Sequence, residues 1–103
     1  MNTIRDMDDR FAALRDATAS ALLRGPGATS VELRQLIARG EPPPDLSSLV
    51  EQIRSHAYTV TNEDVDALRA RYTEGQLFEI IVAAAFGAAQ ERLSAARRVL
   101  EGA

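Results

Sequence analysis

Cysteine and lysine are absent from this sequence, and histidine occurs once, as His56. Without cysteine the chain can form no disulfide, no thiolate metal site and no thiol redox centre. A single histidine also argues against a histidine-based metal site within one chain. We therefore predict neither a metal site nor a cofactor.

Excess positive charge and long apolar runs are missing as well. The net charge is −3, and the twelve basic residues, all arginine, are spread along the chain, which argues against a nucleic-acid partner. The longest apolar stretch, residues 77–89, is shorter than the ~20 residues that cross a bilayer. No apolar segment of a secretory signal opens the chain. We expect a cytoplasmic protein with no membrane partner.

The length of 103 residues fits a single helical domain, 1–103, with a small core. An N-terminal helix is predicted from Asn2 or Thr3 to about Arg24. This helix could pack on its own domain or on a partner's copy. We favour an oligomer interface for residues 1–24, because a narrow seam is typical of paired helices. The seam consists of Ile4, Met7, Phe11, Leu14, Thr18 and Ala21.

A short second helix is predicted after a Gly-Pro-Gly turn. Thr29 and Glu32 fit a capping box at its start, and Gly40 fits its end. One side of it is apolar and should point inward: Val31, Leu33, Leu36 and Ile37.

Two more capped helices are expected before the last one. Asp45 should cap a helix over residues 46–58, and Thr61 should cap a helix over residues 62–71. The side chains predicted to be inward or buried are Leu46, Leu49, Val50, Ile53, Ala57, Val65 and Leu68. No strand of convincing length is found.

The most apolar part of the chain is predicted to be one long helix over residues 73–100. Thr73 and Gln76 form a capping box. Residues 77–89 carry apolar side chains around nearly the whole helix, so we expect burial on most sides, and Gly87 should let another helix approach closely. The fold is therefore predicted as all-α, with about five helices and a long central C-terminal helix, in a protein that oligomerises.

Residues 58–93 carry a recognisable pattern. Its members are Val60, Thr61, Glu63, Asp64, Val65, Ala67, Leu68, Arg69, Thr73, Glu74, Phe78, Glu79, Ile80, Arg92 and Leu93. The pattern resembles the C-terminal part of the carboxymuconolactone decarboxylase-like superfamily, which includes the alkylhydroperoxidase D proteins. It covers about a third of the chain. The resemblance implies an all-helical homo-oligomer, a dimer, trimer or hexamer, with residues 46–101 as the family-like core.

The sequence departs from that family where the peroxidase chemistry resides. Peroxidase members carry a Cys-x-x-Cys motif with a nearby histidine and glutamate, and this chain has no cysteine. We therefore exclude thiol peroxidase activity and assign no family role to His56. Decarboxylase-type members do not depend on the cysteine pair.

Four residues are candidates for a catalytic site. Histidine is the residue type suited to acid–base chemistry near neutrality, so His56 could act as an acid or base beside Tyr58, or it could simply favour a helix C-terminus. Glu79, inside the apolar stretch, must be paired or have a raised pKa. It could face a cavity, although the polar edge it shares with Gln76 favours pairing with an arginine. Arg92 could bind an anionic substrate or pair with a carboxylate.

Two classes of function follow from these features. The first, which we favour, is a homo-oligomeric structural or accessory protein without thiol peroxidase activity. The second is a small lyase or decarboxylase that acts on a small anionic acid or lactone, with His56, Tyr58, Glu79 and Arg92 as its residues. A helical adaptor for a larger partner would instead show an exposed apolar stripe over residues 4–22.

Overall fold

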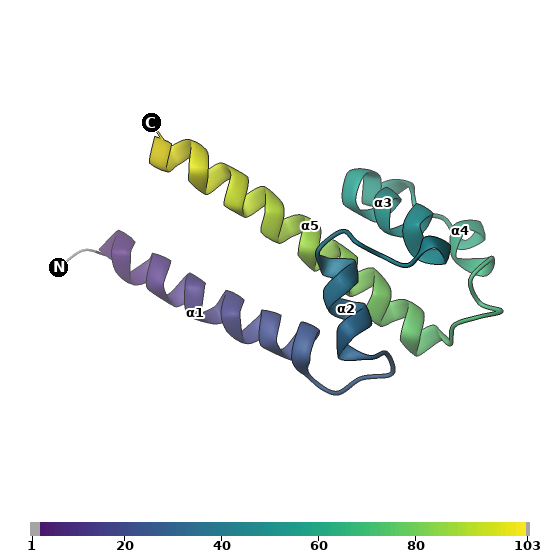
Figure 1. Ribbon diagram of the computed structural model, residues 1–103. Helices are drawn as coiled ribbons and strands as arrows, with labels where there is room; N and C mark the ends of the chain where they lie inside the picture. Colours follow the sequence, from purple (N-terminus) through teal and green to yellow (C-terminus); the bar gives the residue numbers. More distant parts are fainter. Residues whose placement is uncertain (1–2, 103) are drawn as a thin grey trace.

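Five α-helices and two short 3-10 turns make up the computed structural model (Figure 1), which describes the backbone of residues 3–102 and the side chains of residues 9, 10 and 12–102. No strand occurs in this range, so the predicted all-α fold with a long C-terminal helix is confirmed. The elements are α1 (Thr3–Arg24), α2 (Val31–Ala38), η1 (Pro44–Leu46), α3 (Ser47–His56), η2 (Ala57–Thr59), α4 (Asn62–Asp66) and α5 (Glu74–Gly102).

Helix α5 is the element on which α2 and α3 pack. Its start is the predicted capping box: the Gln76 amide N–H donates to the Thr73 hydroxyl (3.1 Å), and the Thr73 amide N–H donates to the Gln76 side chain (2.9 Å). One side of α5 is buried through Leu77, Ile80, Ala83, Ala84, Gly87 and Ala88. The core is completed by Ile37 of α2 and by Leu46, Leu49, Val50 and Ile53.

Two glycines are important near the end of α2: Gly87 on α5, which the end of α2 crosses, and Gly40, which follows α2. Gly87 is buried where the end of α2 crosses α5, and a Cβ at this position would collide with the Ala38 carbonyl. The predicted close approach at Gly87 is therefore confirmed. Gly40 has a φ of 79° and follows α2. The Glu41 N–H donates to the Leu36 carbonyl (2.9 Å) and the Gly40 N–H to the Ile37 carbonyl (3.0 Å), which is a Schellman ending.

Two predicted caps are wrong, because a more distant partner takes each side chain. Ser30, not Thr29, caps α2 by accepting from the Leu33 amide. The Thr29 hydroxyl instead donates to Glu79. Asp45 does not cap α3, which begins after the turn η1 without a side-chain cap.

Asp45 accepts a hydrogen bond from the Tyr72 hydroxyl (2.6 Å). Helix α3 ends at His56, short of the predicted residue 58, and Ala57 is exposed. Helix α4 has the predicted Thr61 cap, but it ends at Asp66 because tight i→i+3 turns continue the chain to Arg71.

Val65 and Leu68 are half-buried. Predicted caps at Asn2 or Thr3 and the seam residues Ile4, Met7 and Phe11 lie outside the described side chains.

The molecule is elongated, 55 Å by 29 Å by 20 Å. Figure 1 shows why: α1 and the C-terminal part of α5 extend beyond α2, α3 and α4 toward the same side, so both ends of the chain lie there. Within residues 3–102, none of the helices combines the length and apolar content that a membrane crossing requires.

Candidate functional site

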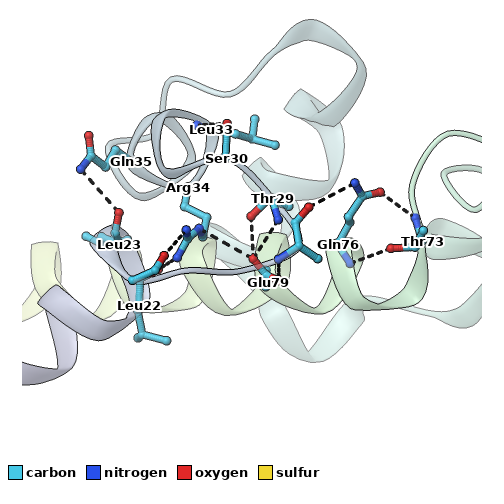
Figure 2. A network of polar contacts seen from close by, with 12 residues as sticks. Leu22, Leu23, Thr29, Ser30, Leu33, Arg34, Gln35, Thr73, Gln76 and Glu79 are labelled. Atoms are coloured by element: carbon cyan, nitrogen blue, oxygen red, sulfur yellow. Dashed lines mark hydrogen bonds and ion pairs between the residues drawn. The ribbon is translucent and has the colours of Figure 1, made fainter.

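Glu79 lies on α5 and forms hydrogen bonds with the loop between α1 and α2 (Figure 2). Its carboxylate accepts from the Thr29 hydroxyl (2.7 Å), the Thr29 amide (3.1 Å) and the Ala28 amide (2.6 Å). The side chain of Gln76, one turn earlier on α5, donates to the Ala28 carbonyl (3.4 Å). A Cβ at Gly27 would meet the carboxylate, so a larger residue here would require the Glu79 side chain to shift.

Arg34 completes the junction from α2 and is 4% exposed. It donates to the Leu22 carbonyl (2.8 Å) and the Gly25 carbonyl (2.5 Å), which would otherwise be unsatisfied at the C-terminal end of α1. Its Nε lies 3.7 Å from Oε1 of Glu79. Three elements, α1, α2 and α5, are therefore connected through one arginine and one glutamate.

The surroundings of Glu79 keep it ionised. The hydrogen bond from the Thr29 hydroxyl is the main reason that the pKa of Glu79 lies below its ordinary value, with the amides of Ala28 and Thr29 and the charge of Arg34 acting in the same direction. A general acid or base that works near neutrality needs a pKa raised toward 7. Glu79 is shifted the other way, as expected for a carboxylate that holds a loop in place.

His56 and Tyr58 lie together at the end of α3, on the surface. Their ring centroids are 6.1 Å apart in an edge-to-face arrangement. Tyr58 is 86% exposed. The shallow depression beside His56 is lined otherwise by exposed or half-buried polar residues of α3: Ser48, Glu51, Gln52 and Ser55.

Arg92 binds the backbone of α3. Its guanidinium donates to the Arg54 carbonyl (2.5 Å), in the last turn of that helix, where a cation is favourable. Arg54 in turn pairs with Glu91 and donates to the Ala38 carbonyl (3.3 Å). This cluster fixes the ends of α2 and α3 on α5.

These four described residues are not gathered around one cavity. Glu79 and Arg92 are thirteen residues apart on α5, or ~20 Å along the helix axis. Glu79 faces the loop after α1, Arg92 binds the last turn of α3, and the rings of His56 and Tyr58 contact each other. Sequence reasoning missed the importance of Arg34, which looks like an ordinary surface arginine. The signal in the sequence was Glu79, because a glutamate inside an apolar stretch needs a partner such as an arginine.

A second feature of α5 is a line of outward-facing apolar side chains, called the α5 stripe below. Phe78 is 68% exposed, Leu93 40% and Leu100 77%. Seen down the helix axis, the stripe falls within an arc of about 80°. It comprises Phe78, Val82, Ala85, Ala89, Leu93, Ala96 and Leu100, all exposed except the half-buried Val82. The sequence predicted burial on most sides of residues 77–89, and ten of these thirteen residues are buried or half-buried. The exposed side of this region carries Phe78, Ala85 and Ala89.

The seam of α1 is also exposed where it is described. Leu14 is 65% exposed, and Thr18 and Ala21 are exposed too. The Thr18 hydroxyl donates to the Leu14 carbonyl (2.9 Å), so its donor hydrogen is satisfied within α1. The half-buried side chains in the described part of α1 are instead Ala12, Arg15, Ala19, Leu22 and Leu23.

The α5 stripe and the described part of the α1 seam border open depressions between α1 and α5. One, of about 310 Å³, lies between Ala21 of α1 and Phe78 and Val82 of α5, and Arg34 and Glu79 line it as well. The other, of about 250 Å³, lies between Leu14 and Thr18 of α1 and the α5 residues Phe86, Ala89, Gln90 and Leu93. We call this pair of depressions the α1–α5 groove.

Comparison of the chain with protein families, with curated proteins and with solved structures found no match. The resemblance of residues 58–93 to the carboxymuconolactone decarboxylase-like superfamily stays a prediction.

Proposed function

We propose that the chain is a cysteine-free, carboxymuconolactone decarboxylase-like helical protein that self-associates and serves a structural or accessory role without thiol peroxidase activity. The observation that supports self-association most is the exposure of the α5 stripe. Phe78 and Leu100, at its two ends, are 68% and 77% exposed in the single chain. Burying a side chain of this size contributes about 1.5–3 kcal/mol.

The contacts of the polar residues also support the proposal, because they argue against a catalytic role. Glu79 and Arg92, two of the four catalytic candidates, have partners within the fold and connect helices. The lyase alternative, with a small anionic acid or lactone as substrate, requires these residues to share a cavity with His56. Their separation along α5 favours the structural role.

Light scattering on the purified chain over a range of micromolar concentrations tests the proposal. The expected mass is well above the 11.2 kDa of one chain and rises with concentration. A constant mass of one chain at every concentration would contradict the proposal.

A matched pair of variants assigns the association to the α5 stripe. Phe78→Asp places a charge on the stripe and should shift the equilibrium toward single chains. Ser94→Asp introduces the same charge at an exposed position of α5 about 140° away from the middle of the stripe and should leave the mass unchanged. An equal loss of mass in both variants would show that added charge, and not the stripe, is responsible.

A further inference from the structure

The α5 stripe has the same spacing when it is read from either end. From Phe78 to Leu100 its members are separated by 4, 3, 4, 4, 3 and 4 residues, so Ala89 is the midpoint. Large side chains stand at both ends, and the midpoint Ala89 is flanked by Ala85 on one side and by Leu93 on the other. A helix face with this symmetry is complementary to a second copy of itself that runs in the opposite direction.

We propose that two copies of the chain pair through antiparallel α5 helices, with a two-fold axis at Ala89. This inference rests on the proposed self-association and specifies its geometry. Phe78 of one copy then faces Leu100 of the other, and Ala89 faces Ala89. A contact in which each surface meets itself closes after two subunits and does not extend into a filament.

The small side chains at the centre suit a close crossing of the two helices. Helix axes approach to about 8–10 Å, with the shorter distances where the side chains at the contact are small. Ala85, Ala89 and Ala96 are all exposed, and in the antiparallel pair Leu93 would lie against the small Ala85 of the other copy. Phe78 and Leu100, beyond them, fill the space that opens as the helices separate.

The α1–α5 groove provides the second wall of the interface. The two depressions lie along the same side of α5 as the stripe and are closed on the far side by Leu14, Thr18 and Ala21 of α1. The partner's α5 would therefore contact both long helices. This arrangement explains why Leu14 and Ala21, the apolar seam residues among the described side chains, are exposed in the single chain.

The surface available is close in size to that of a stable dimer interface. The stripe is ~33 Å long and the two helices together are ~20 Å wide, which gives a footprint of ~660 Å² on each copy. Stable interfaces bury about 800 Å² of accessible surface per partner, and the accessible surface of a ridged helix face exceeds its flat footprint. A second copy is thus an occupant of suitable size and chemistry.

Single-cysteine variants test this geometry directly, because the chain has no cysteine of its own. A disulfide needs Cα atoms within about 7 Å. Ala89→Cys should form a covalent dimer under mild oxidation several-fold faster than Ala96→Cys, because two copies of residue 96 are ~21 Å apart in the antiparallel pair. Ala95→Cys, exposed but off the stripe, is the matched control and should be as slow as Ala96→Cys.

A mixture of Val82→Cys and Ala96→Cys chains provides a second test. These positions face each other, so intact mass spectrometry should find the mixed disulfide in excess over either homodimer. Equally fast cross-linking of Ala89→Cys and Ala96→Cys would indicate parallel helices and overturn the geometry while self-association stands. A wild-type chain that remains single in light scattering would overturn both proposals and leave the groove to a different protein.

Discussion

Glu79 and Arg34 show how a charged pair is placed in a small apolar fold. Each has partners besides the other: Glu79 accepts from the backbone and hydroxyl of Thr29, and Arg34 donates to carbonyls at the end of α1. Breaking a pair of this kind is unfavourable because the remaining group keeps its desolvation penalty. We conclude that the pair fixes the position of α1 relative to α5.

Replacing Glu79 by glutamine is expected to lower the free energy of unfolding by about 1–3 kcal/mol, because the new amide group would point a donor at the donors of Ala28 and Thr29. Urea denaturation at neutral pH measures this loss. Glu51→Gln, at an exposed position, is the control and should change stability by less than about 0.5 kcal/mol. Equal effects of the two substitutions would contradict the role assigned to Glu79.

The contribution of Glu79 to the free energy of unfolding is expected to depend on pH. The pKa of Glu79 in the folded chain lies below its ordinary value of 4.5, so its contribution is complete above that pH and is lost as the pH falls through the lowered pKa. The difference in unfolding free energy between wild type and Glu79→Gln should therefore shrink as the pH is lowered below 4.5. A difference that grows on acidification would show that the sign is wrong.

Tyr72 gives a prediction at alkaline pH. Its hydroxyl donates to Asp45, and this hydrogen bond, with burial, raises the pKa of Tyr72 above its ordinary value of 10.0. The chain has two tyrosines, so absorbance titration of a Tyr58→Phe variant reports on Tyr72 alone. We expect a midpoint above 10.0. The stabilisation is present below that pH and lost as the pH rises through the raised pKa.

At the scale of elements, the crossing of α2 over α5 depends on Gly87. Alanine usually stabilises a helix relative to glycine by about 1 kcal/mol. Gly87→Ala should nevertheless lower the melting temperature, because the added methyl group would meet the Ala38 carbonyl. Gly75→Ala on the same helix, where a Cβ finds only ordinary contacts, should leave the melting temperature unchanged or raise it. A stabilised Gly87→Ala variant would contradict the close approach.

Helix positions were predictable from sequence where the determinants are local. The predicted cap Thr61 and the predicted box of Thr73 with Gln76 involve partners three residues away, and both are present. Thr29 and Asp45 were misassigned because their partners, Glu79 and Tyr72, lie 50 and 27 residues away. A propensity argument cannot foresee such competition, since the distant partner is brought close only by the fold.

At the scale of the whole molecule, the apolar residues of α5 serve two surfaces. One side closes the core of the chain, and the other forms the α5 stripe. Periodicity could not separate them, because residues 77–89 are apolar all round, and only the placement of α2 and α3 shows which side is left open. The seam of α1 was recognisable from its narrow spacing, and the exposure of its described members, Leu14, Thr18 and Ala21, agrees with a contact outside the chain.

Sedimentation of Leu100→Asp beside wild type is the most direct measurement of the central proposal. Leu100 is 77% exposed, so the substitution should leave the helical circular dichroism intact while it places a charge opposite Phe78 of the partner. Ala95→Asp, on the same exposed part of α5 but off the stripe, is the control. We predict that wild type and Ala95→Asp sediment as dimers and Leu100→Asp as a single chain. If all three sediment alike, the α5 stripe is not an interface between copies.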